Sequence, residues 1–151
     1  MPAVTLVDLP GRPCPIAAAL ELVGERWALL IVRELALGNS RFEDIVRGTG
    51  APRDRVAARL KALDDAGVIK RSRYQAAPPR FDYQLTDSGR ALLPVLDALL
   101  AWGLDHAVGT GDPDRHRYHW AKATQRAGRT PRPSSTTARD ASSGGRNARA
   151  Q

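Results

Sequence analysis

The most restrictive feature of the sequence is a change of hydrophobic period at Gly67. Residues 52–66 repeat apolar side chains at the spacing of a helix that buries one face, and the helix is expected to end at this glycine. Residues 81–86 alternate between apolar and polar side chains, which is typical of a half-buried strand. With another strand expected over residues 68–74, the sequence predicts an amphipathic helix followed directly by a two-stranded hairpin.

The tip of the expected hairpin carries Pro78, Pro79 and Arg80. Proline lacks an N–H group and fixes φ, so the two prolines stiffen the loop and do not extend the strand ladder. A stiff loop loses less entropy when Arg80 is held against a phosphate or in a narrow minor groove. The alternative is that the prolines only protect a strand edge, with Arg80 paired to Asp82 or to water. Neighbouring basic side chains favour DNA contact; they are Lys70, Arg71 and Arg73.

The outer face of the helix over residues 52–66 is basic and small. Short side chains such as Ala57 and Ala58 would let the helix approach the floor of a groove about 12 Å wide. A short helix through Val46 and a turn at Gly48-Thr49-Gly50 are expected before it, which completes a helix-turn-helix pattern. The alternative is an ordinary solvated helix face. The candidate DNA-binding residues are Arg41, Arg53, Asp54, Arg55, Ala58, Arg59, Lys61, Arg73, Pro78, Pro79 and Arg80.

Helices are expected on both sides of this unit. One begins at Pro15 and breaks at Gly24, a second covers residues 25–37, and a long last helix follows a Thr86 cap, with Pro94 expected to kink it or remove a hydrogen bond. The last helix is apolar over more than one stripe, so a partner helix is its natural cover. Trp102 is expected to fill a core or an interface and not to serve as a ligand platform. The candidate dimer-interface residues are Ile16, Leu20, Leu92, Leu96, Leu99, Leu100 and Trp102.

The positive charge of the chain is unevenly distributed. The net charge is +7, but residues 109–151 hold nine basic and three acidic side chains, so most of the excess lies there. Residues 41–80 hold ten basic and five acidic side chains, a segment that would aim one face of the body at phosphate. We therefore expect an N-terminal arm over residues 1–13, a folded domain over 14–108, and a basic, low-complexity and largely disordered tail over 109–151. This tail is either a merely solvated extension or a basic arm that attracts phosphate without sequence preference.

Several classes of protein are disfavoured by what the sequence lacks. No apolar run approaches the roughly 18 residues of a membrane span, and the N-terminus does not resemble a signal peptide, so a cytoplasmic location is expected. The single cysteine excludes a disulfide within the chain. An enzyme is not expected, because His106, His116 and His119 have no carboxylate or cysteine at a ligand spacing and no glycine-rich phosphate loop is present. No cofactor or metal is expected.

Five stretches together resemble the HxlR-type winged helix-turn-helix regulators, over about residues 12–106. These are Cys14-Pro15, Gly24 with Trp27, Arg41-Phe42-Glu43, RLKALDDAGVI and PPRFDYQLTDSGRALLPVL. The resemblance implies a mainly α, MarR-like fold with a two-stranded β-hairpin wing, dimerisation through the terminal helices, and repression from a palindromic operator. It places the recognition surface on residues 53–61 and the wing on residues 78–81. Asp54 departs from the residues common at its place, and it could accept from cytosine N4 or order Arg55 or Arg53. The alternative function is a winged-helix module for protein–protein contact without specific DNA binding.

Cys14 is the candidate for a redox sensor. A cysteine at a helix N-terminus with Arg12 nearby should have an increased thiolate fraction. The resemblance implies sensing of quinones, aldehydes or oxidants by a cysteine at this place. The alternatives are a structural capping residue and a small aromatic or flavin-like effector bound in a cavity at the dimer interface.

Overall fold

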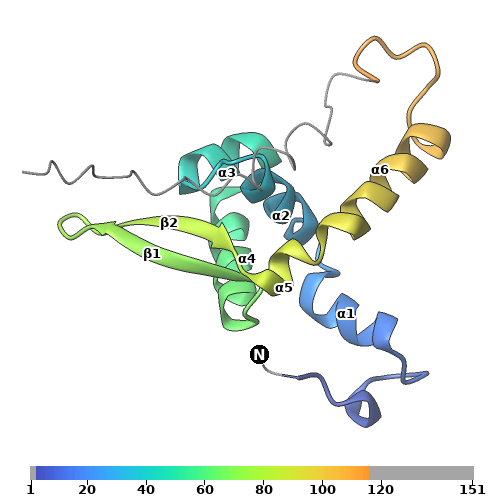
Figure 1. Ribbon diagram of the computed structural model, residues 1–151, viewed down its shortest axis with the longest axis horizontal. Helices are drawn as coiled ribbons and strands as arrows, with labels where there is room; N and C mark the ends of the chain where they lie inside the picture. The colour runs from blue at the N-terminus through green and yellow to red at the C-terminus, as the bar shows by residue number, and fades with distance from the viewer. Residues whose placement is uncertain (1–2, 116–151) are drawn as a thin grey trace, which may run out of the picture.

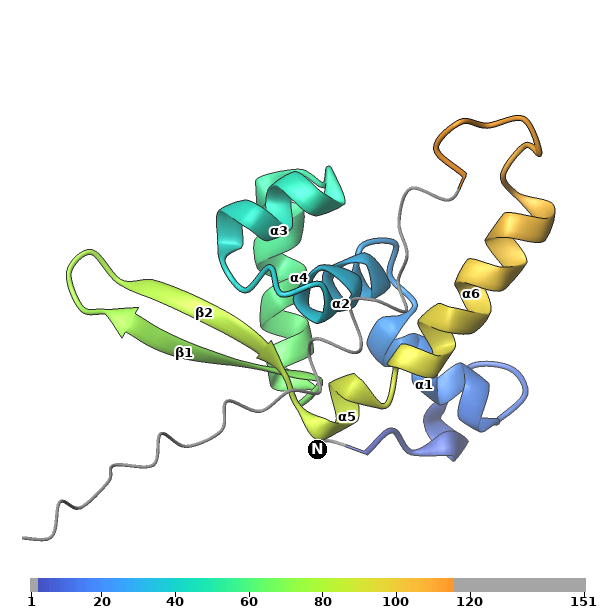
Figure 2. The ribbon, with the colours of Figure 1, turned by 45° about the horizontal axis from the view of Figure 1, so that its top comes forward.

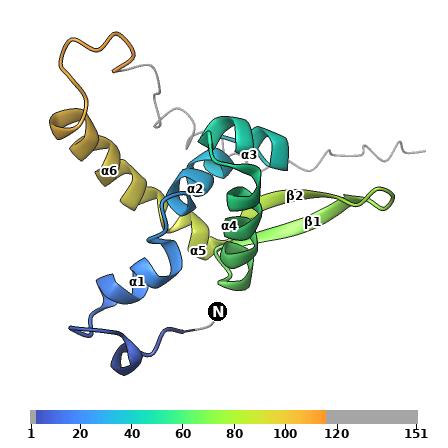
Figure 3. The same cartoon turned by 180° about the vertical axis from the view of Figure 1, so that it is seen from behind.

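The computed structural model describes residues 3–115 and shows a group of helices from which one hairpin extends. The described elements, after the 3₁₀ turn η1 (Leu6–Asp8), are α1 (Pro15–Val23), α2 (Ala28–Ala36), α3 (Phe42–Thr49), α4 (Arg53–Asp65), β1 (Ile69–Gln75), β2 (Arg80–Leu85), α5 (Asp87–Arg90) and α6 (Leu93–His106). Helices α2, α3 and α4 gather at the base of the hairpin, and α1 and α6 lie on the opposite side (Figures 1 and 3).

The core lies where α2, α3 and α4 meet the base of the hairpin. The predicted apolar stripe of α4 is confirmed, because Val56, Leu60 and Leu63 are all buried. Ile31 of α2 and Ile45 of α3 are fully buried against them. Burial of a side chain of this size contributes about 1.5–3 kcal/mol, so this stripe fixes which face of α4 is left for solvent.

The two strands form an antiparallel pair, as the alternation predicts. Ile69 faces Leu85 at the base, and Arg73 faces Phe81 near the tip. The chain before α3 extends this sheet, since the N–H of Tyr83 donates to the carbonyl of Ser40 (2.8 Å) and residues 41 and 82 form an antiparallel bridge. The hairpin is therefore anchored to α3 as well as to α4, and its tip projects away from both (Figure 2).

The turn predicted at Gly48-Thr49-Gly50 is wrong for its first two residues. Helix α3 continues through Thr49, whose hydroxyl donates to the carbonyl of Ile45 at 2.8 Å. Gly48 is needed for space, because a Cβ there would lie 2.0 Å from Oε2 of Glu34. The chain turns at Gly50, which has φ +66° and ends the helix in the left-handed conformation.

The single long helix predicted after the hairpin is also wrong. Thr86 caps the short α5 by accepting from the N–H of Gly89 at 3.2 Å, and α6 starts only at Leu93. Pro94 lies in the first turn of α6, where its missing N–H has no partner within the helix. The proline therefore stands at a helix start and kinks nothing.

Over residues 3–115, none of the helices has the length and apolar character needed to cross a membrane.

Candidate nucleic-acid interface

The outer face of α4 is exposed and carries five of the eleven predicted contact residues. Arg53, Asp54, Arg55, Ala58 and Lys61 all lie on it. Nζ of Lys61 donates to Oδ2 of Asp65 at 2.6 Å, and Nε of Arg55 lies 3.9 Å from Oδ2 of Asp54. The structure thus places Asp54 beside Arg55, one of the two arginines that it was expected to order.

Arg59 is set apart from the other predicted residues of α4. Its side chain is only 27% exposed, and Nη1 lies 3.9 Å from Oε1 of Glu25, in the connection between α1 and α2. The Arg59 side chain therefore points toward the α1–α2 connection and not out from the exposed face of α4. The pairing offers a structural role for Arg59 besides the predicted DNA contact.

The tip of the hairpin is exposed at Pro78, Pro79 and Arg80, as predicted. Arg73 folds over this tip: Nε donates to the carbonyl of Gln75 at 3.1 Å, and Nη2 donates to the carbonyl of Ala76. The guanidinium of Arg73 therefore braces the loop that presents Arg80.

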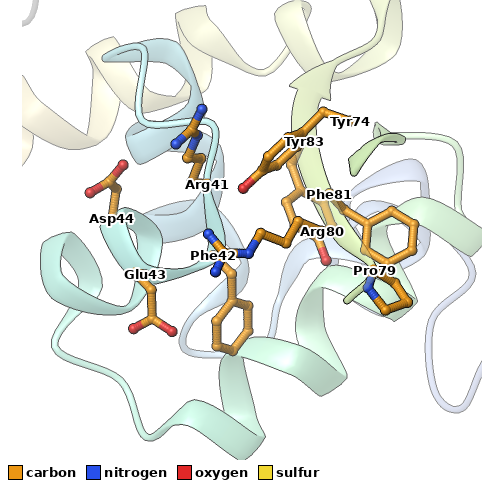
Figure 4. A pocket seen from close by; sticks show the side chains of 9 residues that line it. All are labelled: Arg41, Phe42, Glu43, Asp44, Tyr74, Pro79, Arg80, Phe81 and Tyr83. Carbon is orange, nitrogen blue, oxygen red and sulfur yellow. The ribbon is translucent and has the colours of Figure 1, made fainter. Parts of the chain in front are cut away.

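Arg80 lines a groove between the wing and α3. The groove has a volume of about 610 Å³, and the Arg80 side chain extends across it toward Phe42 (Figure 4). The alternative pairing of Arg80 with Asp82 is not found within residues 3–115, where Oδ1 of Asp82 lies 3.7 Å from Nε of Arg41. The lining residues are Arg41, Phe42, Glu43, Asp44, Tyr74, Pro79, Arg80, Phe81 and Tyr83.

Three arginines around this surface are each held between an aromatic ring and a carboxylate. They are Arg41 with Tyr74 and Asp82, Arg53 with Phe42 and Glu43, and Arg71 with Phe81 and Asp64. The guanidinium carbons lie 4.8, 5.1 and 4.9 Å from the ring centroids, within the range of cation–π attraction. Each of these cations therefore has a preferred direction before any ligand arrives.

The closest of these ion pairs joins α3 to the first residue of α4. Nη1 and Nη2 of Arg53 donate to the two carboxylate oxygens of Glu43 at 2.6 and 2.7 Å. These hydrogen bonds hold the pKa of the Glu43 carboxyl below its ordinary value and raise the pKa of Arg53. Glu43 and Arg53 are thus both charged at neutral pH.

Burial raises the pKa of the Tyr83 hydroxyl in the neighbouring groove.

Cys14 occupies the predicted capping position of α1. Its Sγ accepts from the N–H of Ala17 at 3.4 Å, and the residue is half-buried. Pro15 is the first residue of the helix, as predicted. This hydrogen bond is the one that a structural capping residue would make, and part of Cys14 remains exposed.

The predicted interface residues fall into two groups. Leu92 and Leu96 are half-buried and pack against the core of the chain itself. The other predicted residues are exposed: Ile16, Leu20, Leu99, Leu100 and Trp102. No residue of α6 is buried. Trp102 is 61% exposed, so it fills no core within residues 3–115.

The helices α2 to α4, followed by the β1–β2 wing, define a winged helix-turn-helix protein in which α4 has the place of the recognition helix. The model of the HxlR-like helix-turn-helix family matches residues 22–110, more than half of the chain. The chain therefore belongs to this family. The predicted family and fold class are confirmed, and both are those of transcriptional regulators and not of enzymes.

Known proteins similar to the chain carry regulator names. Rv3095 of Mycobacterium tuberculosis, an uncharacterized HTH-type transcriptional regulator, is 40% identical over 105 residues, which are 69% of this chain and 66% of that protein. A MarR-family structure from Porphyromonas gingivalis W83 is 27% identical, with a TM-score of 0.56 over 66% of this chain and 98% of that one. The reduced form of the transcriptional regulator YodB from B. subtilis is 33% identical, with a TM-score of 0.53 over 66% and 98%.

Phe42 and Glu43 belong to this surface and are not among the predicted contact residues. In the sequence both stand out only as part of the stretch Arg41-Phe42-Glu43, yet the ring and the carboxylate fix the direction of Arg53. Their signal in the sequence is weak, because ten residues and a turn separate Glu43 from Arg53. A contact across that turn becomes visible only once α3 and α4 are packed.

Proposed function

We propose that the protein is a transcriptional regulator that binds double-stranded DNA, with α4 in the major groove and the wing beside it. The observation that carries this proposal is the exposed, small and basic outer face of α4, with Arg55, Ala58 and Lys61 in the recognition position. The family supports it, since relatives such as Rv3095 are named HTH-type transcriptional regulators. The predicted contacts of the wing, including Arg80, belong to the same proposal.

We further propose that the active species is a homodimer, a repressor that binds a palindromic operator. The exposed apolar side chains of α1 and α6, among them Ile16, Leu99 and Trp102, support a second copy as their cover. Two recognition helices related by twofold symmetry read two half-sites related by the same symmetry. The resemblance to HxlR-type regulators supports repression.

Selection from randomised DNA tests this function. The full chain is mixed with a pool of randomised duplexes, bound DNA is amplified over several rounds, and the enriched duplex is compared with a scrambled duplex of the same composition. We expect an enriched palindrome bound at least 10³-fold more tightly, roughly the lower limit for specific binding. A chain that enriches nothing would instead fit the alternative, a winged-helix module for protein–protein contact.

For the signal, we propose modification of Cys14 by an electrophile or oxidant. The partly exposed position of Cys14 at the start of α1 supports it, and the relative YodB has been solved in a reduced form. Quinone treatment should then release the enriched duplex from the wild-type chain and not from Cys14→Ser. Equal release from both proteins would point to the other candidate, a small aromatic effector bound without a thiol.

A further inference from the structure

Glu43 holds the first residue of the proposed recognition helix from a different helix. Its carboxylate accepts from both terminal nitrogens of Arg53, at 2.6 and 2.7 Å, so the pair is bidentate. The two side chains are 63% and 62% exposed. An ion pair this exposed contributes little to stability, so the stability of the fold gives no strong reason for placing an acid here.

Phe42 restrains the same guanidinium from a second side. The guanidinium carbon of Arg53 lies 5.1 Å from the centroid of the Phe42 ring, and Phe42 itself is half-buried against the core. Figure 4 shows Phe42 and Glu43 directed to the same side of α3 and Asp44 directed away from them. Arg53 is therefore oriented by α3, while its backbone belongs to α4.

The hydrogen-bonding capacity of Arg53 is only partly used. A guanidinium has five N–H donors, and Glu43 takes two of them. The remaining donors lie in the fixed plane of the group, and a planar pair of donors matches the O6 and N7 acceptors of guanine. For a phosphate, the same arrangement is unfavourable, because the carboxylate repels it at close range.

We infer that Glu43 is a specificity-determining residue that positions Arg53 for a guanine edge in the major groove and repels DNA phosphate. The inference rests on the proposed DNA-binding function. By fixing the arginine before binding, Glu43 reduces the entropy cost of engaging the correct base. By repelling phosphate from Arg53, it denies this arginine the backbone contact that it would otherwise make on a duplex without that base. Both effects increase the ratio of specific to non-specific affinity.

The test compares DNA selected by two full-length proteins, the wild type and Glu43→Gln. The glutamine keeps the length of the side chain and removes its charge. We expect the variant to lose the preference for guanine at one position in each half-site. Its ratio of affinities for the enriched and scrambled duplexes should fall about tenfold, within the range for one bidentate base contact. Arg53→Lys keeps the charge but loses the planar fork, so it should lose the preference at the same position.

Asp44→Asn is the matched control. Asp44 follows Glu43 in the first turn of α3 and pairs with Arg47 at 3.2 Å, so its removal changes the net charge equally without releasing Arg53. This variant should bind both duplexes more tightly by one factor and keep the selected sequence. If Glu43→Gln behaves in the same way, the inference is wrong while the proposed function stands. If the wild type enriches no sequence, the proposed function fails and the inference with it.

Discussion

Arg53 shows how the environment of a single residue decides what an arginine can contact. On an isolated helix its long side chain would sample many rotamers, and fixing it on a ligand would cost entropy. Here Phe42 and Glu43 hold the guanidinium before any ligand arrives. The ion pair with Arg53 lowers the pKa of the Glu43 carboxyl, so a titration of Glu43 measures the contact directly.

The Glu43 carboxyl should titrate below its ordinary pKa, because Arg53 donates two hydrogen bonds to its charged form. The contribution of a depressed carboxyl pKa to stability is present above the unfolded pKa and is lost as pH falls through the folded pKa. Carbon-detected NMR titration of the side chain checks this. In Arg53→Ala the pKa should return toward its ordinary value, and an unchanged value there would contradict the contact.

Gly48→Ala should destabilise the fold, since the new Cβ would lie 2.0 Å from Oε2 of the buried Glu34. That oxygen cannot retreat freely, because it accepts from Nδ2 of Asn39 at 2.7 Å. Crowding of this kind costs about 1–3 kcal/mol, measurable by urea unfolding. Gly109→Ala is the control, since Gly109 lies outside the helices and nothing lies within 4 Å of a Cβ there. Equal stability of Gly48→Ala and the wild type would contradict the close approach.

At the scale of elements, the wing is a hairpin that projects from the helical core. Its base is buried at Ile69 and Leu85, while its tip is exposed and is braced by Arg73. The prolines that are predicted to stiffen the loop lie at this tip, and Arg80 beside them reaches into the groove toward α3. Arg80 of the wing and Arg41, just before α3, are thus the basic side chains of one concave surface, and α3 itself lines it with Phe42, Glu43 and Asp44.

Arg80→Ala should weaken DNA binding about tenfold, the loss expected for one charge-assisted contact. The fold should not change, because Arg80 is exposed and makes no ion pair within residues 3–115. Fluorescence anisotropy with the enriched duplex measures the affinity, and circular dichroism checks the fold. Arg12→Ala removes an exposed charge just before α1, which lies on the opposite side of the molecule from the hairpin, and is the control. Unchanged affinity for Arg80→Ala would leave the prolines as an edge guard only.

The elements were largely predictable because each has its own local signal. The apolar stripe of α4, the alternation in β2 and the Cys14-Pro15 start of α1 all lie within a few residues of the structure that they determine. The end of α3 was missed because Gly48 is read as a turn residue unless the Glu34 side chain beside it is known. The pairing of Glu43 with Arg53 was missed for the same reason, since tertiary packing brings the two together.

At the scale of the whole molecule, the described chain leaves one apolar side without cover. Helix α6 has no buried residue, and Ile16 of α1 is 73% exposed. Helix α1 lies on the same side of the molecule as α6 (Figures 1 and 2). Exposed apolar side chains gathered on two helices are typical of a protein interface. A second copy would cover them and would place two α4 helices on one DNA duplex.

Leu99→Lys should convert the proposed dimer into a folded monomer, because Leu99 is 48% exposed and its replacement leaves the core intact. Analytical ultracentrifugation measures the mass, and circular dichroism checks that the helices remain. Asp97→Lys is the control on α6, an exposed position about 200° away around the helix. A Leu99→Lys protein that sediments like the wild type would contradict an interface centred on α6.

The central claim, that α4 presents its basic face to DNA, is tested most directly by the salt dependence of duplex binding. Affinity for the enriched duplex is measured between about 50 and 200 mM salt for the wild type and for Arg55→Ala/Lys61→Ala. The basic segment over residues 109–151 is present in both proteins, so the difference between them reports on α4. We predict a steep negative log–log slope for the wild type, shallower in the variant by about 0.9 for each phosphate that the variant no longer neutralises. A flat slope, or the same slope in both proteins, would contradict the claim.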